Sequence, residues 1–202
     1  MSPVNPIGGV YVINLDRRAD RLKEITEELE RIDLPFKRFQ AIERNPGILG
    51  CGLSHLAVLK EARSLGLENV LILEDDFTLL VDKKDFWRKI HEFFFTQSEF
   101  DVCMLAYGMQ YSRTHTNLLV KVLEAQTASG YIVNKCFYDA LINLYEDAMP
   151  LLEKTHHHWI YANDQVWKKL QPEANWFAFK DRIGKQRASY SDLAGKFVDY
   201  DA

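Results

Sequence analysis

Three adjacent acidic residues close a short apolar run and carry the strongest chemical signal in the sequence. The run is Val70–Leu73, and Glu74, Asp75 and Asp76 follow it directly. Four consecutive aliphatic residues predict a strand buried on both faces, so the carboxylates lie where that strand leaves the core. A hard cation such as Mg²⁺ or Mn²⁺ relieves the repulsion between neighbouring carboxylates and usually takes a phosphate as a further ligand. The pattern predicts a divalent-cation site; a solvated turn or an acidic helix N-terminus is the alternative.

Basic residues gather immediately after the first predicted strand. Asn14 is followed by Arg17, Arg18 and Arg21 at the turn into a helix. Guanidinium groups beside free backbone N–H groups suit a phosphate or nucleotide, and an asparagine can contact a base or ribose. Ordinary capping by Asp16 with surface arginines explains the same residues equally well. The chain lacks GxGxxG and GxxxxGK[ST], so neither a dinucleotide-binding fold nor a P-loop ATPase is supported.

A glycine-rich segment precedes a serine and a histidine. Gly50, Cys51 and Gly52 lead into Ser54 and His55. Glycines let the backbone approach a ligand closely, and the serine is suited to cap the next helix. A histidine in a first helical turn is more often a structural hydrogen-bonding group than a catalyst. No activating partner can be assigned to the cysteine, which we interpret as a small packing residue.

An isolated acid, Asp164, lies between Trp159 and Trp167. An acid flanked by aromatic residues is suited to have a raised pKa and to accept a proton from a substrate hydroxyl. The aromatic residues themselves are suited to stack on a sugar. An N-cap for a helix ending at Leu170 is an equally good interpretation, and both can hold together. The run His156–His158 cannot direct three side chains at one ion from regular structure, so we predict a polar loop with one histidine near the site.

Strands and helices alternate along the chain. The apolar patterns predict strands at 10–13, 36–42, 70–73, 101–106, 118–124 and 129–133, and helices at 18–32, 54–65, 84–95 and 135–145. The segments 45–52 and 108–117 are predicted loops. This order favours a single α/β domain, a Rossmann-like αβα sandwich with a mostly parallel sheet that binds ligands at the carboxyl ends of its strands.

Composition excludes several classes of protein. With 25 basic against 29 acidic residues, the chain is not suited to coating nucleic acid. Cys51, Cys103 and Cys136 are widely spaced without a CxxC, so they predict reduced thiols rather than a disulfide framework. The first apolar run, Val10–Ile13, is too short for a signal peptide or a membrane span. We therefore expect a cytoplasmic protein without a transmembrane segment.

Three motifs in register resemble glycosyltransferase family 25, which includes bacterial lipopolysaccharide and lipooligosaccharide galactosyltransferases and the collagen galactosyltransferases. The motifs are VYVINLDRRADR, GILGCGLSHLAVLKEA and NVLILEDDF, which span roughly residues 8–80. A looser resemblance continues at Ala128–Val133 and at Asp164. The resemblance implies one domain of GT-A type over 1–202: a nucleotide-sugar and metal half at 8–80, an acceptor half at 100–180, and a tail at 181–202 that is either a mobile lid or a disordered basic segment.

The resemblance also implies an inverting transfer that uses a nucleotide sugar, most often UDP-galactose, and a divalent ion, Mn²⁺ or Mg²⁺. Carried over to this sequence, Asp76 is the metal ligand and Asp164 is the catalytic base. The residues expected to bind the donor are Asn14, Arg17, Arg21, Ser54, His55, Glu74, Asp75, Lys185 and Arg187. The acceptor is a hydroxyl of a glycan, a lipid-linked sugar or a protein, and its pocket is expected in variable loops such as 108–117.

Two other classes of function remain open at this point. A catalytically silent nucleotide-sugar binding module would keep the donor pocket and lose the base, although the intact acidic motif argues against it. A Mg²⁺-dependent phosphohydrolase or nuclease would also place acids at a strand end. Such enzymes normally assemble a second group of acids into a two-metal site, and the sequence shows no second acidic cluster after a strand.

Overall fold

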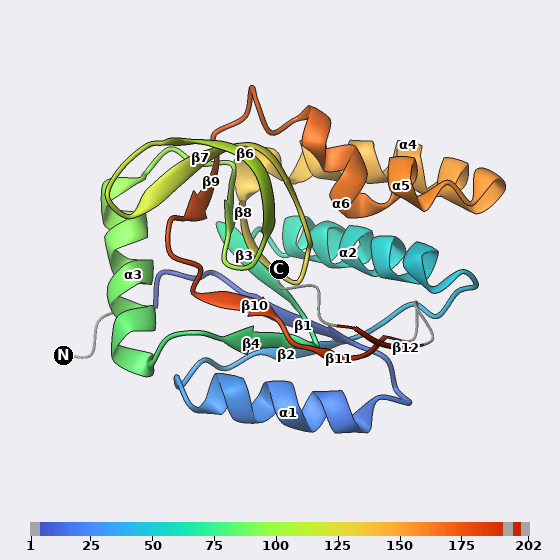
Figure 1. Ribbon diagram of the computed structural model, residues 1–202, viewed down its shortest axis with the longest axis horizontal. Helices are drawn as coiled ribbons and strands as arrows, with labels where there is room; N and C mark the ends of the chain where they lie inside the picture. The colour runs from blue at the N-terminus through green and yellow to red at the C-terminus, as the bar shows by residue number, and fades with distance from the viewer. Residues whose placement is uncertain (1–4, 192–195, 199–202) are drawn as a thin grey trace.

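An eight-stranded mixed sheet forms the centre of the computed structural model, which describes residues 5–191 and 196–198 (Figure 1). Its strand order is β2-β1-β3-β8-β5-β9-β7-β6. The strands are β1 (Val10–Asn14), β2 (Lys37–Gln40), β3 (Asn69–Glu74), β5 (Val102–Met104), β6 (Gly108–Thr114), β7 (Leu119–Gln126), β8 (Gly130–Asn134) and β9 (Trp176–Phe179). The pairs β1–β2, β1–β3 and β5–β9 are parallel. The pairs that involve β7 or β8 are antiparallel, so these two strands run against the others.

Helices cover both faces of the sheet (Figure 1). Helices α1 (Ala19–Glu30) and α3 (Lys83–Thr96) share one apolar core with the sheet. Helices α2 (Gly47–Ser64) and α4 (Tyr138–Thr155) share the core on the other face, where the short α5 (His158–Tyr161) and α6 (Asn163–Val166) also pack. The predicted α/β sandwich is therefore confirmed.

Strand β3 separates the two cores. Val70 and Ile72 belong to the core beneath α2 and α4, whereas Leu71 and Leu73 belong to the core beneath α1 and α3. All four side chains are fully buried. Successive residues of a strand point to opposite faces, so an uninterrupted apolar run is what a strand with a core on each side requires. The strand leaves this double core at Glu74, which positions the acidic motif at the edge of the sheet.

Short elements complete the fold and bring the C-terminal segment against β3. Strand β4 (Phe77–Leu79) follows the acidic motif directly and pairs antiparallel with β10 (Gly184–Gln186). Strands β11 (Ser189–Ser191) and β12 (Lys196–Val198) form a further pair, and two 3₁₀ helices, η1 (Lys135–Phe137) and η2 (Trp167–Lys169), connect larger elements. No helix in the described ranges has the length and apolar character needed to cross a membrane.

The prediction of a loop over 45–52 is wrong, because α2 already begins at Gly47. Gly50 lies inside this helix, where an added Cβ would stand 2.2 Å from the carbonyl oxygen of Ile42. The glycine is therefore needed for close packing of the helix on the preceding segment rather than for a loop conformation.

The predicted polar loop at 108–117 is also wrong over most of its length. Residues Gly108–Thr114 form β6, which pairs with β7 at one end of the sheet. Most of β6 is exposed, since an edge strand has a neighbour on one side only. Its polar sequence reflects that exposure.

Candidate active site

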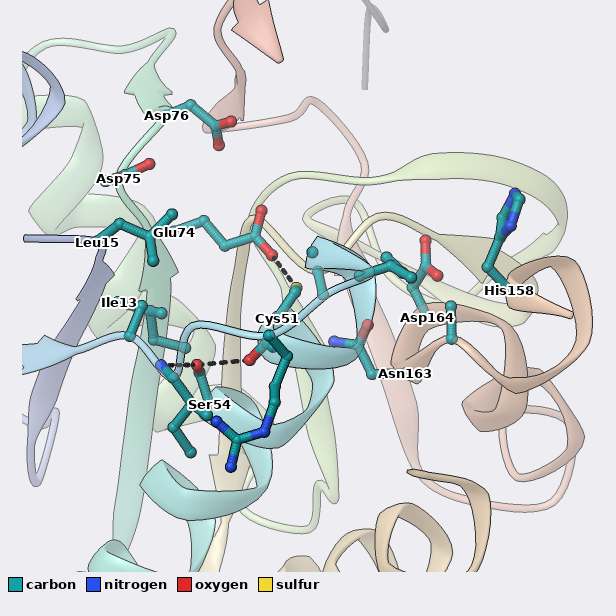
Figure 2. A pocket seen from close by; sticks show the side chains of 18 of the residues that line it. Ile13, Leu15, Cys51, Ser54, Glu74, Asp75, Asp76, His158, Asn163 and Asp164 are labelled. Carbon is teal, nitrogen blue, oxygen red and sulfur yellow. Dashed lines mark hydrogen bonds between the residues drawn. The ribbon is translucent and has the colours of Figure 1, made fainter. Parts of the chain in front are cut away.

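A cavity of about 700 Å³ opens where β1 and β3 end. Because these strands are parallel neighbours, their carboxyl ends and the loops that follow meet at the same edge of the sheet. Seven of the predicted site residues line the cavity: Arg17, Arg21, Ser54, Glu74, Asp75, Asp76 and Asp164. Figure 2 shows Glu74, Asp75 and Asp76, at the end of β3, on one side of the cavity and Asp164 on the other.

One arginine bridges two of the acids after β3. Arg21 donates to Asp75 at 2.9 Å and to Asp76 at 3.1 Å, so helix α1 contributes a cation directly to the acidic end of the strand. Burial raises the pKa of Asp75 even though Arg21 and Asn14 act to lower it. Burial, followed by the charge of Glu74, raises the pKa of Asp76 to about 7. The arginine therefore compensates only part of the negative charge that the fold gathers here.

The carboxylates of Asp76 and Glu74 are suited to bind a hard divalent cation. Oδ1 of Asp76 is buried and has no hydrogen-bond partner, whereas Oδ2 accepts from Arg21 and Gln186. Glu74 lines the same cavity and supplies a second carboxylate. An unpartnered buried oxygen is costly unless a ligand satisfies it, and Mg²⁺ and Mn²⁺ prefer oxygen ligands. The donor set of this site is therefore suited to the cation that the sequence predicts.

Glu74 is held from the side of helix α2. His55 lies fully buried, with Nε2 3.1 Å from Oε1 of Glu74 and Nδ1 2.9 Å from the hydroxyl of Tyr131. Cys51 donates to the same Glu74 oxygen at 3.3 Å (Figure 2). Burial acts to raise the pKa of Glu74, but the hydrogen bond and charge of His55, then Cys51 and Arg21, lower it overall. These contacts keep Glu74 in its charged form.

Two predicted donor-binding residues, Asn14 and His55, lie behind the cavity wall rather than in it. The amide of Asn14 donates to Asp75 at 2.8 Å and to the carbonyl of Arg18 at 3.0 Å, and its oxygen accepts from Arg38. The cavity lining within the described residues includes neither Asn14 nor His55. Each of them holds one acid that does line the cavity.

Ser54 lines the cavity floor from the middle of α2, so the prediction that it caps this helix is wrong. Its hydroxyl donates to the carbonyl of Gly50 at 2.7 Å and accepts from the backbone N–H of Ile42 at 2.8 Å (Figure 2). The serine therefore ties the segment before α2 to the helix. Arg17 lies at the exposed margin of the cavity and pairs with Glu43.

Lys185 and Arg187 are absent from the cavity lining of the described chain, and Gln186 between them is present. Residues of a strand alternate in direction, and all three are at or next to β10. The backbone N–H of Arg187 donates to the carbonyl of Asp76 at 2.6 Å, and its guanidinium pairs with Glu24 at 2.9 Å. Residues 192–195 and 199–202 of the predicted tail lie outside the described residues.

The opposite wall of the cavity comes from the segment that contains α5 and α6. Asp164 accepts a hydrogen bond of 3.1 Å from the backbone N–H of Thr127 and one of 3.3 Å from Gln165. Burial raises the pKa of Asp164, and the charge of Glu74 adds to that effect. A carboxylate of raised pKa that faces a cavity is a good proton acceptor for a bound hydroxyl.

The two tryptophans that flank Asp164 have different environments. Trp159 lines the cavity and is 60% exposed. Trp167 is fully buried against Tyr131 and Trp176 and donates to the carbonyl of Ala125, so the prediction that it stacks on a sugar is wrong. The predicted histidine near the site is His158, the first residue of α5, which lines the cavity.

Sequence reasoning missed two residues that contact the acids. The sequence predicts no strand at 184–186, so it gives no signal that Gln186 rather than its two basic neighbours faces the cavity. Cys51 was interpreted as a packing residue, although it and His55 are four positions apart on one helix and therefore share a face.

The family model described as "Glycosyltransferase family 25 (LPS biosynthesis protein)" matches this chain over residues 8–47 and 45–151. A relative from Haemophilus influenzae, a proposed glycosyltransferase, is 32% identical over 97 residues, which cover 37% of this chain and 34% of the relative. The aligned part is thus about a third of the length of that curated relative. Asp164 and Gln186 lie outside the residues that the family model matches.

Two solved structures share the fold at low sequence identity. The glycosyltransferase GlyE of Streptococcus pneumoniae TIGR4 is 12% identical with a TM-score of 0.52, over 88% of this chain and 46% of that one. A glycosyltransferase involved in the glycosylation of the major capsid of PBCV-1 is 12% identical with a TM-score of 0.51, over 90% of this chain and 93% of that one. These likenesses support the predicted GT-A type of α/β fold.

Proposed function

Because the chain belongs to glycosyltransferase family 25, we propose that it transfers a sugar from a nucleotide-sugar donor bound in the acid-lined cavity to an acceptor hydroxyl. The observation that carries this proposal is that a group of three acids and a single acid, Asp164, line opposite sides of one cavity of about 700 Å³. The acids after β3 suit a cation and the leaving diphosphate, and Asp164 faces them from the other wall.

On the donor side, Asp76 and Glu74 would hold a divalent cation, either Mn²⁺ or Mg²⁺. When bound, the cation supplies positive charge to the diphosphate as it leaves the sugar. Arg21 holds Asp75 and Asp76 in place, and Arg17 at the cavity margin is positioned to meet an incoming phosphate. Such charges accelerate transfer because they stabilise the departing diphosphate more strongly than the intact donor.

On the acceptor side, Asp164 would take the proton of the attacking hydroxyl. The backbone N–H of Thr127 and the amide of Gln165 orient its carboxylate. Attack from the side of the sugar opposite the diphosphate inverts the anomeric carbon, and a base across the cavity from the acids suits that direction. Asp164 thus acts as a general base on the attacking hydroxyl.

We propose UDP-galactose as the donor and a hydroxyl of a glycan, a lipid-linked sugar or a protein as the acceptor. The family description, which names lipopolysaccharide biosynthesis, supports a glycan acceptor. Ser54 and Gln186 would contact the donor from the cavity wall, with Asn14, His55, Lys185 and Arg187 acting from behind it through the backbone or side chains they hold.

A donor screen tests the proposal. We expect UDP to raise the Tm of the protein in the presence of Mn²⁺ and not in the presence of EDTA. We also expect UDP release from UDP-galactose to depend on added acceptor. Binding of UDP without release from any UDP-sugar would indicate a catalytically silent module instead. Hydrolysis of simple phosphate esters without sugar transfer would indicate a phosphohydrolase.

A further inference from the structure

Three side chains of different chemistry meet at one edge of the cavity: Cys51, His55 and Glu74, here named the Cys-His-Glu cluster. Cys51 and His55 are four residues apart in α2, so they share one face of that helix. Glu74 ends β3, which packs against α2. One ligand atom from each residue lies within 4.8 Å of the other two.

We propose that the Cys-His-Glu cluster binds a thiophilic divalent cation such as Zn²⁺, at a position that shares Glu74 with the hard-cation site at Asp76. Sulfur, imidazole nitrogen and one carboxylate oxygen form a donor set that Zn²⁺ accepts readily, whereas Mg²⁺ and Mn²⁺ prefer oxygen alone. The two sites therefore differ in the class of metal they select.

The two separations that involve Glu74 fit such an ion, and the third ligand-atom pair, Cys51 and His55, lies within 4.8 Å. Oε1 of Glu74 lies 3.3 Å from Sγ of Cys51 and 3.1 Å from Nε2 of His55. Two ligands on a tetrahedral Zn²⁺, with bonds of about 2.0 to 2.3 Å, stand roughly 3.4 Å apart. An ion can thus replace the protons that now lie between these atoms with small movements of the side chains.

A buried partner orients the histidine for this role. The hydroxyl of Tyr131 lies 2.9 Å from Nδ1 of His55. When Nε2 binds a metal, Nδ1 carries the proton and donates a hydrogen bond to that hydroxyl, and such partners typically fix a metal-binding histidine in place. Tyr131 itself is fully buried and packs against His55 and Trp167, so its position is well determined.

The cluster also has an open side. Cys51 and Glu74 line the cavity, so an ion held by the three residues would keep a fourth position facing the cavity. Asp76 and Asp164 line the same cavity and add negative charge around that position. The cluster therefore combines three protein ligands, a route of entry and a favourable potential.

Binding of Zn²⁺ has a consequence for transfer. Glu74 would be engaged by the thiophilic ion and lost to the donor side of the cavity, so Zn²⁺ should inhibit transfer even when Mn²⁺ is present. This consequence rests on the proposed function, whereas binding of the ion does not.

Co²⁺ is the probe for the test, because Co²⁺ bound to a thiolate gives a charge-transfer band in the near ultraviolet. We expect one thiolate-bound Co²⁺ per full chain, displaced by Zn²⁺. The band should vanish in Cys51→Ser and persist in Cys136→Ser, which removes an exposed thiol, and in Asp76→Asn. Tyr131→Phe should weaken Zn²⁺ binding by about tenfold.

Absence of the band, its persistence in Cys51→Ser or its loss in Asp76→Asn would overturn the inference. If Cys51→Ser does not fold, alkylation of the wild-type protein with and without Zn²⁺ replaces it: Zn²⁺ should protect Cys51 in a peptide map, and equal labelling is the opposing result. UDP release without a cobalt band would leave the proposed function standing alone. A cobalt band without UDP release would leave only the metal site.

Discussion

The side-chain amide of Gln186 donates a hydrogen bond of 3.2 Å to Oδ2 of Asp76, although the two residues are 110 positions apart in the chain. Strand β10 brings them together by pairing with β4, which follows the acids directly. The C-terminal segment is therefore part of the cavity wall. It acts on the acid that we propose as the metal ligand.

Gln186→Ala should weaken binding of UDP in the presence of Mg²⁺. The amide lowers the pKa of Asp76 against burial and the charge of Glu74, so its loss moves that pKa above about 7. A hydrogen bond worth about 1 kcal/mol corresponds to roughly fivefold in affinity. Calorimetry at about pH 6.5 and pH 8.5 should show the larger loss at the lower pH, where less Asp76 is ionised. Gln97→Ala, at the end of α3, is the matched control, and an equal loss at both pH values would contradict the prediction.

Asp76→Asn should stabilise the metal-free protein at high pH. The pKa of Asp76 is about 7 in the folded state against 3.8 for an unperturbed aspartate, so the folded state binds this proton more tightly. The corresponding stability is present below about pH 4 and is lost as the pH rises through 7. Asparagine cannot ionise, so the variant should gain roughly 3 to 4 kcal/mol over wild type at pH 8 relative to pH 4.

Urea unfolding in EDTA at the two pH values measures this difference. Asp147→Asn, an exposed change on α4, should show no such pH-dependent gain. The prediction for Asp76→Asn fails if its advantage over wild type is the same at both pH values.

Asp164→Asn should remove transfer and retain donor binding. Loss of a general base typically costs two to four orders of magnitude, so we expect kcat to fall at least about a hundredfold. The amide still accepts from the backbone N–H of Thr127 and so should keep the local structure. Transfer assays and UDP titrations on the same preparations separate the two effects, with Asp147→Asn as the control acid. A kcat close to wild type would remove Asp164 from the mechanism.

The two tryptophans beside Asp164 should respond to substitution in opposite ways. Trp159 is 60% exposed at the cavity, so Trp159→Ala should leave stability within about 0.5 kcal/mol and raise the KM of a sugar acceptor about fivefold. Trp167 is fully buried, so Trp167→Ala should lower the free energy of unfolding by about 3 to 5 kcal/mol. Urea unfolding and acceptor titrations distinguish the two residues. Similar stability losses in both variants would show that Trp159 is structural.

The sequence predicted β3 and its acids because the local pattern is sufficient there. A strand with a core on each face must be apolar throughout, and it can become acidic only where it leaves both cores. The direction of β7 and β8 could not be predicted in the same way, because strand pairing depends on connections rather than on composition. The start of α2 was missed because Gly50 satisfies a contact with Ile42 in another segment.

The same division applies to the cavity. The arginines after β1 and the acids at the end of β3 could be predicted from the sequence because they lie where neighbouring strands end. Gln186 was not, because its contact with Asp76 depends on the pairing of β10 with β4 over a long separation in the chain. Lys185 and Arg187 are chemically more conspicuous than their neighbour, but strand geometry determines which side chain meets the cavity.

The pairing of β10 with β4 determines when the cavity can be completed during synthesis of the chain. A ribosome that has just made Asp76 must add a further 110 residues before Gln186 exists to reach it. A nascent chain can assemble much of the sheet in that interval while the acidic end of β3 still lacks its cover. The side of the cavity at Asp76 is therefore completed late in translation, after the sheet that supports it.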